Sequence, residues 1–389
     1  MTKTAPEMTN SLSTIIIDRI MEEGPISFCD FMEMALYYPG YGYYTSAGDK
    51  IGHGGDFYTS PYTTGLFGEM LAGQFEEMWQ LMDRQPFTIV EQGAGTGLLC
   101  QDILRRLMAN PALYDRLSYI IVEKSGPMRD KARRLLSGRE NAVIRWIGSI
   151  QDLSPVTGCI FSNELIDNFA VHQVVMQDEL MEVFVDFRDG FVETLRPASP
   201  ALIGYLCELQ VTLPTGFRTE INLQAVDWIK CVSDVLHKGF VMTIDYGYPS
   251  SDLYSPGKKD GTLVCYHRHQ VNYCPYENVG QQDITSHVNF SALEQWGATS
   301  GLEQCGYTNQ AYFLRGLGLA NHLRRLEEKS AAACATDPAI AADHFATRQQ
   351  LLLLHNQLMD MGNKFKVLIQ RKGLGKTFLS GLQFAQRLV

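Results

Sequence analysis

The sequence predicts an α/β fold with a Rossmann-like parallel sheet covered by helices on both faces. Short apolar strands alternate with helical patterns in the first half of the chain, which is typical of such a sheet. The expected strands of this series are Phe87–Val90, Tyr119–Val122, Val143–Trp146 and Cys159–Phe161. The sheet is expected to continue through the apolar Gly239–Ile244 and to close with Tyr307–Leu314 and Phe365–Arg371, the last one antiparallel.

The segment before the sheet, residues 1–85, is expected to form a helical and glycine/tyrosine-rich lid. A helix is predicted at about Thr14–Glu22, and Ser27 with Asp30 resembles a capping box that opens a second helix. The stretch 37–60 carries six Gly and six Tyr, so a loop is expected there. A long apolar-periodic helix follows from about Leu66 to Met82.

The Rossmann-like core is placed at residues 86–314 and 364–373, with two insertions. Strand-like runs around 177–179 and 189–190 predict an inserted β-meander, within a region at about 173–236 that ends in a helix. The second insertion, about 248–290, is rich in Pro, Gly, Asp and Tyr, which predicts mostly irregular structure. Residues 315–363 are expected to form a helical insertion.

Composition and charge exclude several classes of protein. The 389 residues include 33 Lys and Arg against 43 Asp and Glu, a formal charge of −10, and no basic run is present. Binding to nucleic acid or to an anionic membrane surface is therefore not expected. No stretch approaches the ~18–20 apolar residues that span a bilayer, and the start of the chain lacks a secretory or mitochondrial targeting pattern. The nine scattered cysteines form no CxxC pair, which predicts reduced thiols and a cytoplasmic location.

The most informative segment is a glycine turn after the first core strand. Gly93, Gly95 and Gly97 stand at alternate positions between a strand and a helix. Glycine permits positive φ and close backbone approach, so this turn can place a ligand against the first N–H groups of the helix. A dinucleotide fingerprint would carry its third glycine one residue later, where Leu98 stands, which argues against NAD or FAD.

An acid closes the next strand. Glu123 follows Tyr119–Val122, and in such sheets an acid at this place accepts hydrogen bonds from both hydroxyls of a ribose. A solvent-facing carboxylate is the alternative. Together with the glycine turn and Glu91, Glu123 favours the ligand-binding role, and S-adenosylmethionine fits this frame without a pyrophosphate.

Several short blocks occur in an order that resembles a known family. They are 26–39 with 42–44, Gly55–Pro61 with Phe67–Glu69, Asn163–Asn168 with Val171 and Gln173, Ile244–Tyr248, Gly261–Leu263, Asp283–Phe290 and Phe365–Leu368. Their sequences and order resemble the MidA family of class I S-adenosylmethionine-dependent methyltransferases. The chain departs from the family pattern at Tyr62, Ala94 and Thr96, and has Ala170 where a proline is common.

The resemblance implies S-adenosylmethionine as cofactor and an arginine side chain of a partner protein as acceptor, with a respiratory NADH dehydrogenase subunit as one such partner. The cofactor-binding residues that follow from it are Glu91, Gly93, Ala94, Gly95, Gly97 and Glu123, with Asp56, Thr59 and Ser60 from the glycine/tyrosine-rich loop. The glycines of that loop suit a lid that moves when ligand binds.

Methyl transfer to a guanidinium requires carboxylates that pair with the cation and orient it. Glu164 is predicted to pair with the acceptor and Asn163 to position a ligand, because both follow a core strand at the ligand-binding edge. Capping of a following helix is the alternative for both. Asp167 would share a helical face with Glu164 as a second carboxylate, or complement the helix dipole. Asp245, after a buried strand, is expected to bind the acceptor or to order its loop.

No metal site is predicted. The spacing of His267, His269, His287, Cys265 and Cys274 matches no common zinc site, and methyl transfer needs no metal. His287 is a candidate for shaping the acceptor pocket, with a purely structural role as the alternative. Tyrosines 37, 38, 41, 43 and 44 are expected to line the acceptor channel or to pack beneath the lid.

Two other functions stay open from the sequence. A non-catalytic scaffold or assembly factor would bind cofactor and partner yet transfer no methyl group, and Tyr62, Ala94 and Thr96 leave room for it. A small-molecule methyltransferase also fits, because the sequence does not define the acceptor pocket. The sequence sets neither the oligomeric state nor the number of methyl groups transferred.

Overall fold

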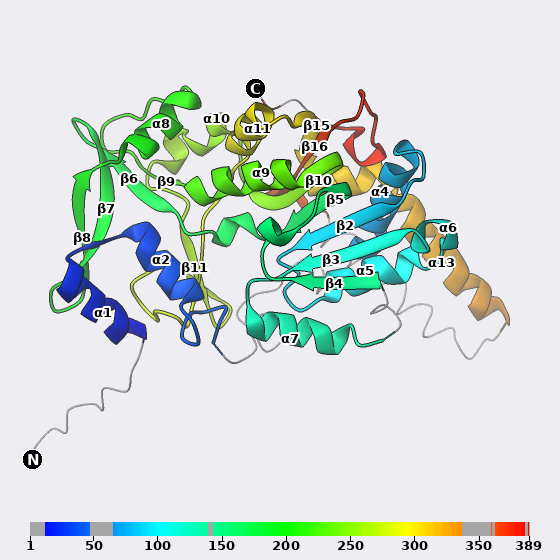
Figure 1. Cartoon of the computed structure of the whole chain (residues 1–389), viewed down its shortest axis with the longest axis horizontal. Helices are drawn as coiled ribbons and strands as arrows, with labels where there is room; N and C mark the ends of the chain where they lie inside the picture. The colour runs from blue at the N-terminus through cyan, green and yellow to red at the C-terminus, as the bar shows by residue number, and fades with distance from the viewer. Residues whose placement is uncertain are drawn as a thin grey trace, which may run out of the picture.

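The core of the protein is one large mixed sheet (Figure 1). The computed structural model describes residues 12–46, 65–138, 143–336, 359, 362–385 and 388. The sheet has the order β4-β3-β2-β5-β10-β16-β15, and the short β14 pairs with the end of β10. Neighbours are parallel except around β16, which is antiparallel to β10 and β15, so the predicted sheet is confirmed. The strands are β2 Phe87–Gln92, β3 Leu117–Val122, β4 Ile144–Ile147, β5 Val156–Asn163, β10 Leu236–Tyr248, β14 Val288–Asn289, β15 Glu303–Asn309 and β16 Phe365–Lys372.

Helices cover both faces of this sheet because successive strand side chains point to opposite sides. Ile89 packs in one apolar cluster with α4 and α5, whereas its neighbour Val90 packs in a second cluster with α9 and α11. Phe161 and Ile160 of β5 divide in the same way. The central strands are therefore buried on both faces, which explains their continuous apolar sequences. The helices are α4 Leu66–Leu81, α5 Leu98–Leu107, α6 Pro111–Tyr114, α7 Gly126–Leu135, α9 Leu223–Val235, α11 Phe290–Thr299, α12 Gln310–Gly316 and α13 Leu319–Thr336.

A second layer stands beside the core, at the left of Figure 1. It contains an antiparallel sheet in the order β1-β7-β6-β9, with β8 against β7, and a three-stranded sheet in the order β12-β11-β13. Helices α1 and α2 share an apolar cluster with residues of both sheets. Its elements are α1 Leu12–Glu23, β1 Ile26–Ser27, α2 Phe28–Tyr37, β6 His172–Met176, β7 Leu180–Phe187, β8 Phe191–Pro197, α8 Pro200–Glu208, β9 Arg218–Ile221, α10 Ser250–Leu253, β11 Val264–His267, β12 Gln270–Asn272 and β13 Asp283–Thr285.

Local signals in the sequence place the start of α2 and the end of β15. The Ser27 hydroxyl accepts from the Asp30 backbone N–H at 3.0 Å and donates to the Asp30 carboxylate at 2.6 Å, which confirms the predicted cap. The predicted strand Tyr307–Leu314 is wrong after residue 309. There the Asn309 side chain accepts from the Tyr312 N–H at 2.7 Å and starts α12.

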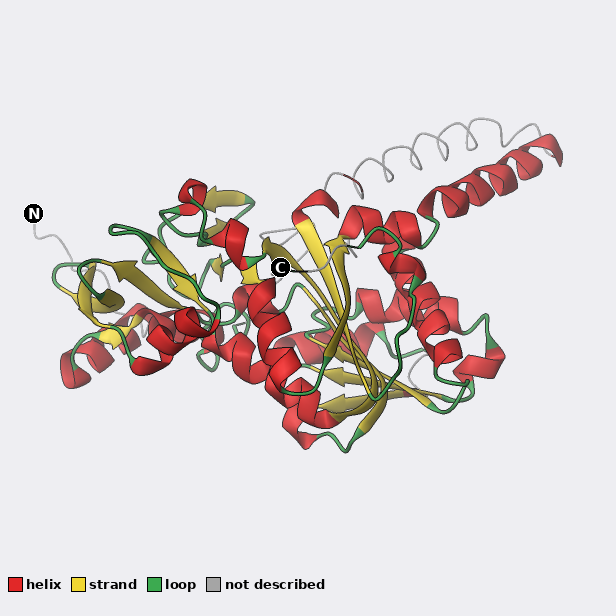
Figure 2. Ribbon diagram, turned by 90° about the horizontal axis from the view of Figure 1, so that it is seen from above, coloured by secondary structure: helices red, strands yellow, loops and turns green. Residues whose placement is uncertain are grey.

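The expected division of the chain also differs from the structure. Helix α4, expected in the lid segment 1–85, and helix α9, expected in the insertion 173–236, both bury apolar faces on the core sheet. The region 248–290, expected to be mostly irregular, contains β11–β14 and α10. Helix α13 lies in the predicted helical insertion and extends away from the sheet (Figure 2), whereas residues 337–358 lie outside the described part of the chain.

Gly158 of β5 tests how closely the central strands approach each other. It has a φ of +150°, and a Cβ atom there would lie 2.0 Å from the backbone oxygen of Thr88 in β2. Gly158→Ala should lower the free energy of unfolding by about 2–4 kcal/mol, because the backbones of β5 and β2 would both have to shift to make room for the Cβ atom. Chemical denaturation measures this. Gly148→Ala is the control, since a Cβ atom there meets nothing within 4 Å, and equal stability of the two variants would contradict the prediction.

Candidate active site

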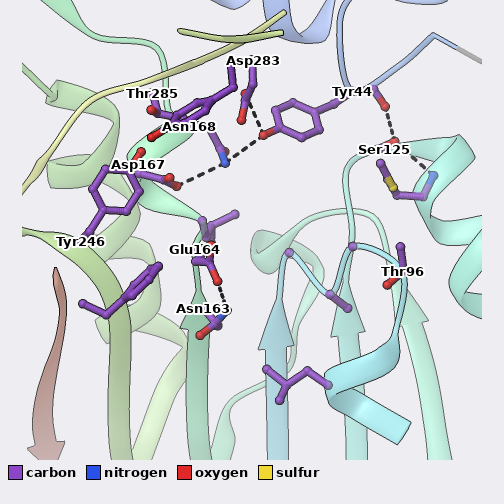
Figure 3. A pocket seen from close by; sticks show the side chains of 18 of the residues that line it. Tyr44, Thr96, Ser125, Asn163, Glu164, Asp167, Asn168, Tyr246, Asp283 and Thr285 are labelled. Carbon is purple, nitrogen blue, oxygen red and sulfur yellow. Dashed lines mark hydrogen bonds between the residues drawn. The ribbon is translucent and has the colours of Figure 1, made fainter. Parts of the chain in front are cut away.

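A cavity of about 620 Å³ opens at the carboxyl ends of β2, β3, β5 and β10. Ligands bind at this edge in open α/β sheets. The turn after β2 and the end of β3 form one side, and the loop after β5, the end of β10 and the strands β11 and β13 form the other (Figure 3). The predicted residues that line it are Glu91, Gly93, Ala94, Gly95, Glu123, Asn163, Glu164 and Asp167.

The glycine turn has the backbone conformation that its sequence predicts. Gly93, Gly95 and Gly97 have φ values of +71°, +54° and +84°, a region that side chains with a Cβ atom disfavour. Gly97 is the N-cap residue of α5 and lies behind the cavity lining. A Cβ atom on Gly93 would lie 2.8 Å from Cδ1 of Leu165, so the turn also packs against the loop after β5.

Glu123 holds this turn in place. Its carboxylate accepts from the Gly95 N–H at 3.1 Å and from the Ser125 N–H at 2.8 Å. Burial raises the pKa of Glu123, and these two backbone donors and Arg129 oppose the rise. Each carboxylate oxygen has a second lone pair, so Glu123 can accept from a ribose while it fixes the turn. The predicted ribose contact thus stays a prediction that this geometry permits.

Glu91 is the second acid on this side. It is 3% exposed and accepts from the Tyr119 hydroxyl at 2.6 Å. Burial raises its pKa to about 7, although the Tyr119 hydrogen bond opposes the shift. Ala94 and Thr96, where the chain departs from the family pattern, are both buried and line the cavity.

These residues fit the cofactor that the sequence implies. The positive-φ glycines leave room where side chains would stand, and the buried Glu123 carboxylate lies directly beside the turn. Asp56, Thr59, Ser60 and Tyr62 lie outside the described part of the chain.

The opposite end of the cavity is a network of carboxylates and tyrosines. In Figure 3 the Tyr44 hydroxyl points toward Asp283 and Asn168; it donates to Asp283 at 2.9 Å and accepts from Asn168 at 3.3 Å. Asn168 also donates to Asp167 at 3.2 Å, and Tyr37 donates to Asn168 at 2.9 Å. Asp167 and Asp283 are 4% and 2% exposed, yet both line the cavity.

The loop after β5 brings two predicted acceptor residues into the cavity, but not as a helix. Glu164 has a φ of +51°, and its side chain accepts from Asn163 at 3.2 Å. Asp167 lies in the short 3-10 helix Ile166–Asn168, so the expected common helical face of Glu164 and Asp167 is wrong. The N-cap residue of that helix is Leu165, and its side chain makes no capping hydrogen bond. The alternative that Asn163 and Glu164 cap a following helix is therefore also wrong.

Asp245 has a positioning role. It is fully buried and does not line the cavity. Its carboxylate accepts from the N–H groups of Leu165, Ile166 and Tyr246 at 3.2, 2.9 and 2.9 Å. The expectation that Asp245 binds the acceptor is therefore corrected in favour of its alternative, which is to order the loop.

The acceptor end carries negative charge. Glu164, Asp167 and Asp283 line this end, and Lys364 is the one lysine or arginine among the described residues that line the whole cavity. Burial raises the pKa of Asp167 well above its ordinary value, and the nearby Asp245, Asp283 and Glu164 raise it further. A cationic ligand at this end would relieve that repulsion.

The structure separates the remaining candidates. Of the N-terminal tyrosines, Tyr37 and Tyr44 line the cavity. His287 also lines it, between the rings of Tyr246 and Tyr248, and burial with Lys258 and Lys366 lowers its pKa to about 4. His267 instead faces the Gln281 carbonyl at 2.8 Å. Within the described ranges, no group of three His, Cys, Asp or Glu could hold a metal ion, and no helix is long and apolar enough to cross a bilayer.

Sequence reasoning assigned no role to Asp283 or Ser125. Asp283 is the first residue of the block Asp283–Phe290, and this position was the feature of the sequence that could have indicated a role for it. Ser125 caps α7 by accepting from the Met128 N–H and donates to the Tyr44 carbonyl at 2.6 Å. Ser125 therefore joins the N-terminal segment to the loop that follows β3.

Comparisons with known proteins agree with this geometry. The model of a family described as S-adenosyl-L-methionine-dependent methyltransferases matches residues 70–308. The chain is 28% identical to the mitochondrial protein arginine methyltransferase NDUFAF7 homolog of Caenorhabditis elegans, over 93% of this chain and 86% of that protein. It is 26% identical to human mitochondrial protein arginine methyltransferase NDUFAF7, over 89% and 80% respectively. A crystal structure from Burkholderia thailandensis, bound to S-adenosyl-homocysteine, aligns with a TM-score of 0.85 at 30% identity, covering 100% of this chain and 99% of that one.

The glycine turn predicts a clear binding defect. Gly95→Val should weaken S-adenosyl-homocysteine binding at least tenfold, because a β-branched residue at a φ of +54° distorts the turn. Calorimetric titration measures the affinity. Gly204→Val in α8 is the control, since a Cβ atom there has open space, and unchanged binding by folded Gly95→Val protein would refute the assignment.

Glu91 predicts a pH dependence of stability. Its pKa in the folded protein is about 7, above the ordinary 4.5, so its burial costs free energy progressively as pH rises from 4.5 to 7. Glu91→Gln keeps an acceptor for Tyr119 and removes this cost. The variant should gain stability over wild type by on the order of 3 kcal/mol at pH 8 and little at pH 4.5.

Thermal or chemical unfolding across this pH range measures the difference. Glu179→Gln, on an exposed turn, controls for the loss of one carboxylate. A pH-independent difference between Glu91→Gln and wild type would contradict the prediction.

Proposed function

Because the chain belongs to a family of S-adenosyl-L-methionine-dependent methyltransferases, we propose that it methylates an arginine side chain of a partner protein. The matches also confirm the resemblance to the MidA family and S-adenosylmethionine as cofactor. When bound, this cofactor supplies an electrophilic methyl group on a sulfonium centre.

The observation that carries the arginine proposal is the carboxylate network opposite the glycine turn. A guanidinium is a planar cation with five N–H donors, and carboxylates bind it through charge-assisted hydrogen bonds. Asp167, Asp283 and Glu164 supply such acceptors along one side of the cavity. The aromatic ring of Tyr246, which also lines the cavity, is a further group that favours a cation. The names of the curated relatives, which call them protein arginine methyltransferases, support the same acceptor.

The chain's own residues divide the work of the reaction. Asp283, oriented by Tyr44 and by the Ile284 N–H, holds the guanidinium through its N–H groups. Glu164 and Asn163 hold the acceptor at the strand edge next to the glycine turn. The nitrogen that gains the methyl group loses a proton. Asp167, ionised when the guanidinium pairs with it, accepts that proton, because burial and the neighbouring carboxylates make it more basic than an ordinary aspartate. The surrounding tyrosines exclude water from these charges.

Labelled methyl transfer tests the proposal. Protein incubated with methyl-labelled cofactor and NADH dehydrogenase subunits or arginine peptides should yield label that acid hydrolysis recovers as methylated arginine. Label on another residue type, or on small molecules alone, would leave a methyltransferase with a different acceptor. No transfer by protein that binds S-adenosyl-homocysteine would favour the scaffold alternative. The cytoplasmic location predicted from the sequence stays a prediction; the curated relatives are named as mitochondrial.

Asp283→Asn should lower kcat/KM for the arginine acceptor by about 10–100-fold, because it removes charge-assisted hydrogen bonds worth about 1.5–3 kcal/mol. Its affinity for S-adenosyl-homocysteine should stay close to that of wild type, since Asp283 lies opposite the glycine turn. Asp115→Asn, an exposed position after α6, is the control. Full activity of Asp283→Asn would remove Asp283 from acceptor binding.

A further inference from the structure

A second cavity of about 630 Å³ lies beside the acceptor end of the first. Among the described residues, Val264 and His287 line both cavities. No residue of the glycine turn lines the second one, so it lies on the acceptor side of the site. Its volume is within the ~300–1,000 Å³ range of ligand-binding pockets.

An ion pair across three strands of the inserted sheet fixes one wall of this cavity. Arg218 of β9 donates to both carboxylate oxygens of Glu193 in β8, at 2.8 and 2.6 Å, and also to the side chain of Gln173 in β6. Tyr276 donates to the same Glu193 carboxylate at 2.9 Å. Bidentate pairs of this kind hold their partners in a defined geometry, so the wall is pre-organised.

The rim of the second cavity exposes apolar surface. Tyr273, which lines it, is 76% exposed, and Val271 two residues earlier is 54% exposed. Exposed aromatic and aliphatic side chains at the edge of a cavity are typical of protein-interaction sites. Arg218 and Lys258 balance Glu193 and Asp260 in the lining, so the cavity carries no net charge that would select a charged side chain.

We propose that the second cavity binds an uncharged side chain of the substrate polypeptide next to the acceptor arginine, with Tyr273 covering it. This inference rests on the proposed function. When the guanidinium lies among the carboxylates of the first cavity, the main chain that carries it leaves past Val264 and His287, which border the second cavity. A free amino acid would fill only the first. The acceptor is therefore a segment of polypeptide chain that the enzyme recognises at two side chains, the arginine in the first cavity and an uncharged side chain in the second.

Thiol footprinting tests occupancy of the second cavity directly. Cys274 lines this cavity and is half-buried, whereas Cys207 in α8 is exposed and lines neither cavity. The probes are a pool of peptides with four varied residues on each side of a central arginine, and N-acetyl-arginine methylamide. With S-adenosyl-homocysteine present, saturating peptide should slow maleimide labelling of Cys274 at least fivefold and leave Cys207 unchanged. The amide should protect neither thiol. Unprotected Cys274, or equal protection of both thiols, would overturn the inference.

Kinetics with the same acceptors provide the second test. Wild type should methylate the best peptides with a kcat/KM at least tenfold above that of the amide. Tyr273→Ala should bring this ratio close to one, whereas Phe378→Ala, at a position 70% exposed and outside both cavities, should keep it. If wild type methylates the amide as well as the peptides, the inference fails and the arginine proposal stands. If protein that binds S-adenosyl-homocysteine methylates neither acceptor, the arginine proposal fails, and the inference with it.

Discussion

The geometry of the site depends on the buried carboxylate of Asp245, which does not itself line the cavity. Asp245 lies near the carboxyl end of β10 and is fully buried. Its carboxylate accepts hydrogen bonds from three backbone N–H groups, two in the loop after β5 and one in its own strand. Burial raises its pKa to about 7, and the backbone N–H groups that it accepts from oppose this rise by stabilising the ionised form. The loop that it fixes carries Glu164 and Asp167 toward the acceptor. The same loop presses Leu165 against Gly93 on the cofactor side. One buried carboxylate therefore orders the loop that borders both the glycine turn and the carboxylate network.

The acceptor end concentrates features that would destabilise an ordinary core. Asp167 and Asp283 are almost fully buried beside other carboxylates, and Glu164 holds a positive φ that non-glycine residues seldom adopt. Tyrosine hydroxyls and backbone N–H groups satisfy part of these oxygens. Under the proposed function, a bound guanidinium would offset part of the remaining cost, so acceptor binding would also stabilise the site.

The sequence predicted best what local geometry determines. Glycines at 93, 95 and 97 predicted a turn with positive φ values that could bind a ligand. The alternation of apolar strands with helices predicted the sheet with helices on both faces, including its antiparallel β16. What it missed depends on contacts between distant residues. Asp245 has the same local context whether it faces a ligand or a loop, and the loop that it binds is some 80 positions earlier in the chain. Asp283 contacts Tyr44 only in the folded chain, so no local sequence pattern indicated its role. The 3-10 geometry around Asp167 likewise follows from Asp245, not from its neighbours.

The order of strands in the sheet has a consequence for how a cell must make this protein. Strand β16 is the last strand in the described part of the chain, yet it lies between β10 and β15. Until β16 has emerged from the ribosome, β10 has an open edge and β15 has no partner in the sheet. The Tyr44–Asp283 contact spans 239 positions, and Glu77 receives the Ser380 N–H from 303 positions away. Unpaired edges of this length invite pairing with other chains. The nascent polypeptide therefore exposes the edge of β10 until residues 365–372 have been made, and a product that ended before β16 would keep this edge as a template for aggregation.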